Sequence, residues 1–94
     1  MMKQYTLHDY AMAPEYPCGA VVLARKINPD IFIEWGEAYL LETDNGTILT
    51  RLAPGKDEAH LLCVRDNAQQ YPSFDIPKQA VLGFYRVTAC AKFV

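Results

Sequence analysis

The side chains that could act as nucleophiles in this sequence are few and scattered. Ser73 is the only serine, and it follows Pro72 with no lysine or histidine at a useful spacing, so we expect it to have a turn role. Cys18 lies beside Gly19 in a loop and could present an accessible thiol, although a partly buried structural cysteine is the more common case. A hydrolase that uses Cys18 as its nucleophile is therefore kept as an alternative interpretation.

Metal ligation and disulfide formation have equally weak signals. The two histidines, His8 and His60, are far apart and have no carboxylates or cysteines at ligand spacing. The three cysteines, Cys18, Cys63 and Cys90, form an odd set without CxxC spacing. We therefore predict no metal site, no cofactor and no disulfide framework, and we expect reduced thiols that are mostly buried.

The composition limits the classes of function. A chain of 94 residues with 51% hydrophobic and 21% charged residues predicts a single globular domain, residues 1–94, with one modest core. The net charge of −2 and the lack of a basic run argue against direct nucleic-acid binding. The longest apolar run, residues 20–24, is far shorter than the roughly 20 residues of a membrane-spanning helix. With no signal-peptide core at the amino terminus, a cytoplasmic protein without membrane contact is expected.

The clearest structural signal is a β-hairpin predicted from Trp35 to Leu52. The central dipeptide Asn45-Gly46 tolerates the two positive φ angles of a two-residue type I′ loop. Counting outward from this loop places Leu41 opposite Thr50. Because side chains alternate along a strand, two faces are expected. One carries Tyr39, Leu41, Thr43, Ile48, Thr50 and Leu52, and the other carries Ala38, Leu40, Glu42, Leu49 and Arg51.

Charged residues of the hairpin are expected to lie at the surface. Arg51 is predicted either to snorkel to the surface or to pair with a carboxylate such as Glu42. Glu34, Glu37, Glu42 and Asp44 are interpreted as a solvated face.

The remaining sequence predicts a mainly β domain with no firm helix. Further strands are expected at 20–27, 60–65 and 81–93, loops at 9–19 and 53–58, extended chain at 71–77, and a lead-in or edge strand at 1–8.

The last predicted strand, residues 81–93, alternates apolar odd positions with more polar even positions, which predicts one buried and one wet face. This alternation puts Leu82, Phe84 and Cys90 on the less apolar face. Uncovered apolar groups on a terminal strand favour pairing with another chain.

Several short motifs occur in a fixed order over residues 9–87. They are Ala11-Met12-Ala13-Pro14 followed by Gly19, Trp35-Gly36 with Tyr39, Asn45-Gly46, Thr50-Arg51-Leu52, Cys63-Val64-Arg65-Asp66-Asn67 and Tyr71-Pro72. Together they resemble the LexA-like carboxy-terminal domain, the serine peptidase domain of phage-type repressors, which is related in fold to bacterial signal peptidases. The resemblance implies a mostly β fold with the Asn-Gly hairpin at its centre.

The resemblance also implies where a catalytic pair would stand. In such domains a catalytic serine immediately precedes the methionine of the first motif, and a lysine precedes the arginine and leucine of the hairpin. Ala11 and Thr50 occupy these positions here. Neither a nucleophilic oxygen nor a desolvated amine is present, so a catalytically inactive pseudo-peptidase is predicted. Tyr10 and Arg65 also depart from the residues common at their positions, and the ten residues before Ala11 leave no room for a cleavage segment or a DNA-binding domain.

A role in protein–protein contact is therefore the function that we expect. Self-association as a homodimer, in a repressor or phage-related setting of transcription regulation, is what the resemblance implies. A second alternative is a peptide-binding module, because an emptied cleft could still hold a peptide as an added strand. The residues predicted to rim that cleft are Tyr10, Met12, Tyr39 and Leu41.

Overall fold

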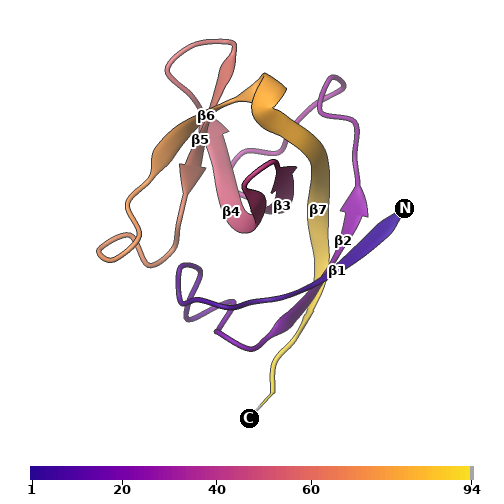
Figure 1. Cartoon of the computed structure of the whole chain (residues 1–94), viewed down its shortest axis with the longest axis vertical. Helices are drawn as coiled ribbons and strands as arrows, with labels where there is room; N and C mark the ends of the chain where they lie inside the picture. Colours follow the sequence, from indigo (N-terminus) through magenta and orange to yellow (C-terminus); the bar gives the residue numbers. More distant parts are fainter. Residues whose placement is uncertain (94) are drawn as a thin grey trace.

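The computed structural model describes residues 1–93, and within this range the chain forms one sheet of seven antiparallel strands (Figure 1). The strands are β1 (Met2–Thr6), β2 (Val21–Lys26), β3 (Ala38–Thr43), β4 (Gly46–Pro54), β5 (His60–Val64), β6 (Phe74–Pro77) and β7 (Val81–Ala91). Their order in the sheet is β1-β2-β7-β3-β4-β5-β6. The prediction of a mainly β fold is confirmed.

The strand positions follow local sequence chemistry. β2 and β5 coincide closely with the short apolar runs that predicted them, and β1 is an edge strand rather than a frayed lead-in. The single helical turn described is the 3₁₀ helix η1 (Lys78–Ala80), which Pro77 precedes. No helix among the described residues is long and apolar enough to cross a membrane.

The hairpin of β3 and β4 forms, but not with the predicted register. Thr43 pairs with Gly46, so the two loop residues are Asp44 and Asn45, and Thr50 lies opposite Tyr39 rather than Leu41. Among residues 1–93 only glycines have positive φ, and Gly46 has a φ of 114°, so the type I′ loop at Asn45-Gly46 is not adopted.

The Thr43 side chain gives a physical reason for this turn. Its hydroxyl accepts a hydrogen bond from the Asn45 amide at 3.1 Å and donates one to the Gly46 carbonyl at 2.9 Å. Local hydroxyl-to-backbone bonds of this kind compete with the turn preference of a dipeptide. The partner of each residue moves by two positions, which leaves the division of side chains between the two faces unchanged.

Both faces of the central hairpin are covered. Leu40 and Leu49 belong to a first core, while Tyr39, Leu41 and Leu52 belong to a second core on the other face. The first core also contains Leu7, Met12 and Ala20 from the connection between β1 and β2. The second core is flanked by Ile27 and Ile33 from the connection between β2 and β3. Each of these long connections therefore covers one face of the sheet.

β7 is a central strand, which corrects the prediction that it offers a pairing edge. It pairs with β2 on one side and β3 on the other, and the two edges of the sheet are β1 and β6. In Figure 1 β7 runs the length of the molecule between β2 and β3. The last strand of the chain thus has its hydrogen-bonding groups engaged on both sides.

Two irregularities in β7 also overturn its predicted alternation. Leu23 pairs with Ala89 and Ala24 pairs with Val87, so Thr88 is an extra residue. A bulge of this kind shifts the phase of the strand. Cys90 consequently packs against the first core together with Val87, whereas Ala89 is exposed.

The second irregularity lies near the start of β7. Glu42 pairs with Gly83 and Thr43 pairs with Val81, which leaves Leu82 without a partner and 66% exposed. Phe84, predicted on the less apolar face, is buried in the second core.

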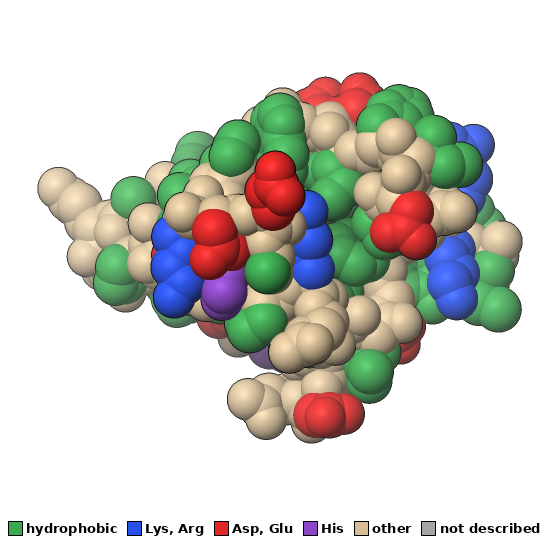
Figure 2. Space-filling model, turned by 90° about the horizontal axis from the view of Figure 1, so that it is seen from above, with side chains coloured by type: hydrophobic (Ala, Val, Ile, Leu, Met, Phe, Trp, Pro, Cys, Tyr) green, Lys and Arg blue, Asp and Glu red, His purple; other side chains and the backbone are tan. Residues whose placement is uncertain are grey.

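Figure 2 shows the end of the molecule that lies at the top of Figure 1. Charged side chains of both signs are scattered there among hydrophobic ones, and the surface between them is hollowed. This end carries η1 and the connection between β4 and β5.

Candidate functional site

The two positions that the resemblance assigns to a catalytic pair are both buried. Thr50, in β4, has none of its surface exposed, and its hydroxyl shares its one proton between the carbonyl oxygens of Arg51 at 3.0 Å and Val64 at 3.1 Å. A hydroxyl that donates to two backbone carbonyls has no base to accept its proton. Thr50 is therefore a satisfied core residue.

Ala11 lies in the connection between β1 and β2 and is fully buried. Its amide donates to the Asp9 carboxylate at 3.0 Å, and its carbonyl accepts a hydrogen bond from the Asn67 amide at 2.9 Å. Because Thr50 bonds to Val64, both positions are tied to the same short segment, residues 64–67, which begins at the last residue of β5. The fold thus attaches the two positions to neighbouring backbone, and neither presents a group that can do acid–base or nucleophilic chemistry.

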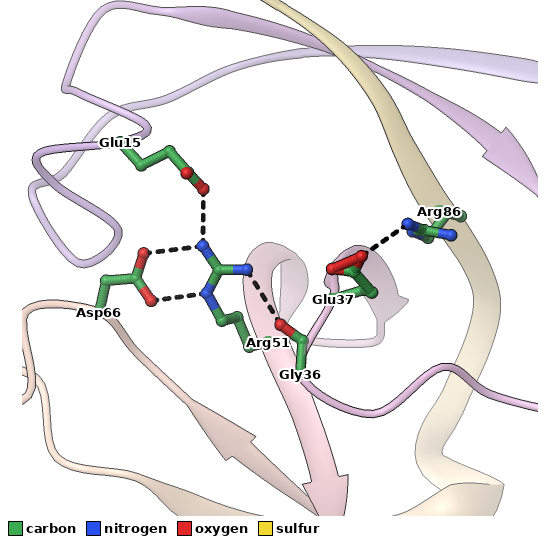
Figure 3. Close-up of polar contacts among 6 residues, drawn as sticks. All are labelled: Glu15, Gly36, Glu37, Arg51, Asp66 and Arg86. Atoms are coloured by element: carbon green, nitrogen blue, oxygen red, sulfur yellow. Dashed lines mark hydrogen bonds and ion pairs between the residues drawn. The ribbon is translucent and has the colours of Figure 1, made fainter.

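Arg51, next to Thr50, holds this region together (Figure 3). Its guanidinium binds both carboxylate oxygens of Asp66, at 2.8 and 3.1 Å, and also the Glu15 carboxylate at 2.6 Å. The Nη1 atom of the same guanidinium donates to the Gly36 carbonyl at 3.0 Å. The prediction that Arg51 pairs with a carboxylate is confirmed, but Glu42 is not its partner, because the fold brings carboxylates from distant segments to Arg51.

The electrostatic consequence is a firmly charged guanidinium. The hydrogen bond with Asp66, followed by that with Glu15, raises the pKa of Arg51 above its ordinary value, although partial burial opposes this shift. Bidentate pairs between arginine and carboxylate combine charge with fixed geometry. Arg51 therefore joins the loop that carries Ala11 to β4 and to the segment after β5.

Three of the four carboxylates predicted as a solvated face, Glu34, Glu37 and Glu42, reach water but also form ion pairs. Arg86, in β7, binds Glu34 at 2.6 Å and Glu37 at 3.0 Å, and Lys3, in β1, binds Glu42 at 2.8 Å. The Lys3–Glu42 hydrogen bond is the main cause that raises the pKa of the lysine and lowers the pKa of the carboxylate. The side chains of these pairs are 27–51% exposed and therefore remain in contact with water, so each pair contributes little to stability.

The four residues predicted to rim a peptide cleft lie in three different places. Tyr10 is 59% exposed, Met12 is buried in the first core, and Tyr39 and Leu41 are buried in the second core. The Tyr39 hydroxyl is occupied as the acceptor for the Glu34 amide at 2.9 Å. The structure therefore brings Tyr39 and Leu41 together but places neither Met12 nor Tyr10 with them.

The cysteines differ strongly in environment. Cys18 is exposed, and its thiol contacts the carbonyl oxygen of Leu7 at 3.9 Å. Burial raises the pKa of the Cys63 thiol to about 11, partly opposed by a hydrogen bond with Thr50. Cys63 is thus an inert core residue at neutral pH.

The histidines have ordinary local partners. The Nδ1 atom of His60 lies 2.7 Å from Asp57, and this contact is the main cause that lowers the pKa of that carboxyl group. His8 packs edge-on against the ring of Tyr5. Within residues 1–93, no cluster of three or more histidine, cysteine or acidic side chains could hold a metal ion.

Sequence reasoning missed several exposed apolar residues in the connection between β2 and β3. Ile31 is 75% exposed, Phe32 is 63% exposed and Trp35 is 49% exposed. Their signal was a cluster of large apolar residues in a segment with no strand periodicity. Arg65, noted only as a departure from the motif, stacks its guanidinium 5.8 Å from the ring centre of Tyr71.

Comparison with known proteins adds no family to this description. A scan against protein-family models and a search of curated proteins each found no match to the chain. The LexA-like resemblance accordingly remains a prediction from the motifs.

Proposed function

We propose that this chain is a catalytically inactive domain of the LexA-like peptidase type, which acts by associating with a second copy of itself. The proposal combines the motif resemblance with the chemistry at Ala11 and Thr50, where a methyl group and an engaged hydroxyl leave nothing to attack a peptide bond. A regulatory setting related to phage-type repressors is part of the same proposal.

The observation that carries the self-association is an uncharged apolar face on the outer side of β1, β2 and β7. It surrounds a shallow hollow of about 330 Å³. Its lining residues are Gln4, Val21, Leu23, Ala89, Cys90, Ala91 and Phe93. Leu23 is 39% exposed and Phe93 is 73% exposed, so apolar area here lies open to water.

The chemistry of this face suits a second copy as its partner. In a two-fold symmetric dimer the same patch meets itself, and no charge would be desolvated because the lining contains none. The bulge at Thr88 turns Ala89 and Ala91 outward, which makes the face continuous with Leu23. In this proposal the apolar face, rather than a free edge of β7, forms the contact with the second copy.

Light scattering over a hundredfold range of protein concentration tests the proposal. We expect the mass of a dimer at the higher concentrations and its loss in the variant Leu23→Asp, which would bury a carboxylate in the interface. Ile31→Asp places the same charge on an exposed apolar residue elsewhere and should leave the dimer intact. A monomer at every concentration, or equal effects of the two variants, would overturn this assignment.

A further inference from the structure

A second hollow lies at the other end of the sheet, where the connection after β2, helix η1 and the start of β7 meet. Its volume is about 390 Å³, which falls within the range of pockets that hold small molecules. Figure 2 looks on this end and shows a depression with hydrophobic side chains in it and charged side chains around it.

The floor of this hollow is apolar and firmly packed. Ile27, Ile33 and Val81 are half-buried against the second core, and Phe84 is 6% exposed. The Ile27 amide donates to the Phe84 carbonyl at 3.0 Å, so the end of β2 is fastened to β7 beneath the floor. The depression is therefore preformed, and a ligand would bury apolar surface without first ordering a loop.

The charges at the rim favour an anion. Lys26 and Lys78 line the hollow from two different segments, and among residues 1–93 neither takes part in an ion pair. The single carboxylate in the lining is that of Asp30. Two ammonium groups against one carboxylate give the lining a net positive charge, although the whole chain has a net charge of −2.

We propose that this hollow binds a small organic anion with an apolar chain and one carboxylate group. The chain would cover the floor formed by Ile27, Ile33 and Phe84, and the carboxylate would lie between the two lysines. Burial of the chain supplies most of the affinity, since exposed ion pairs contribute little, and the lysines select the sign of the charge.

The first test is a titration of the full chain with octanoate, followed by amide chemical shifts. We expect the amides of Ile27, Val81 and Phe84 to shift in a saturable way. Octylammonium, with the same chain and the opposite charge, should bind more weakly. Equal binding of the two probes, no shifts, or shifts confined to the apolar face around Leu23 would overturn the proposal.

Charge variants extend this test, because removing a lysine and removing the carboxylate should change the affinity for octanoate in opposite directions. Lys26→Gln and Lys78→Gln should each weaken octanoate binding about threefold, and Asp30→Asn should strengthen it by a similar factor. Lys56→Gln removes a lysine that does not line the hollow and should leave the affinity unchanged. If the two lining lysines behave like Lys56, the proposed role of the charges is wrong.

These measurements are independent of the proposed dimer. The hollow and the apolar face around Leu23 have no lining residue in common. Octanoate titration of the Leu23→Asp variant should therefore give the same shifts at Ile27, whether or not the wild-type chain associates.

Discussion

Replacing Arg51 should destabilise the protein more than replacing any other arginine of similar exposure. The Arg51 side chain is 24% exposed and makes three contacts with two carboxylates and one with a backbone carbonyl. Charge-assisted hydrogen bonds contribute about 1.5–3 kcal/mol each when well shielded, and partial exposure together with non-additivity reduces their sum. For Arg51→Met we expect a loss of about 2–3 kcal/mol in the free energy of unfolding.

Two further variants separate charge from geometry. Arg51→Lys keeps the positive charge but loses the bidentate contact with Asp66, so we expect about half of the loss. Arg86→Met is the matched control, because Arg86 has a similar exposure of 27% and pairs with two carboxylates. Unlike Arg51, Arg86 forms no bidentate contact with a carboxylate of the described residues. We therefore expect Arg86→Met to lower the free energy of unfolding by about 1 kcal/mol or less.

Urea unfolding of all three variants, with a double-mutant cycle between Arg51→Met and Asp66→Asn, provides the measurement. A coupling energy of about 1 kcal/mol or more is expected for the Arg51–Asp66 pair. If Arg51→Met falls within about 0.5 kcal/mol of the wild type, or equals Arg86→Met, then Arg51 does not hold the three segments together as described.

Three other predictions concern the core, the turn, and the two positions Ala11 and Thr50. Folding raises the pKa of Cys63 from 9.0 to about 11, because the thiol is buried. The stability that the buried neutral thiol contributes is therefore fully present below pH 9 and is lost as the pH rises through 11. In urea unfolding, Cys63→Ala should flatten this alkaline decline in stability. Gly46→Ala should lower the free energy of unfolding by about 1 kcal/mol because of the positive φ of this residue alone, since a Cβ there would meet no atom within 4 Å. A change near zero in the same urea unfolding assay would contradict the described turn. Thr50→Lys should destabilise the chain by about 3 kcal/mol or more at neutral pH because it buries an ammonium group. If the two positions face one another, adding Ala11→Ser should give some labelling by a fluorophosphonate probe.

The strands could be predicted from sequence because their signals are local. Short apolar runs with prolines, glycines and asparagines between them mark β2 and β5, and these two elements lie where they were expected. The sorting of hairpin side chains onto two faces was also predicted correctly, since a shift by two positions preserves the alternation of side chains.

The register of the hairpin could not be predicted in the same way. Asn45-Gly46 is a strong signal for one turn, but the Thr43 hydroxyl forms two bonds that stabilise another. The energies that decide between such turns are of the order of one hydrogen bond, and a dipeptide preference does not include them.

What the sequence determined by itself was the β character of the chain, the approximate positions of its strands, and the absence of a serine or lysine at Ala11 and Thr50. Only the tertiary structure decided that β7 lies between β2 and β3, that both faces of β3 are covered, and that Arg51 meets Asp66 and Glu15. The physical reason is how far apart in the sequence the interacting residues lie. Strand formation depends on neighbouring residues, whereas strand order, bulges and ion pairs depend on segments that are brought together from far along the chain.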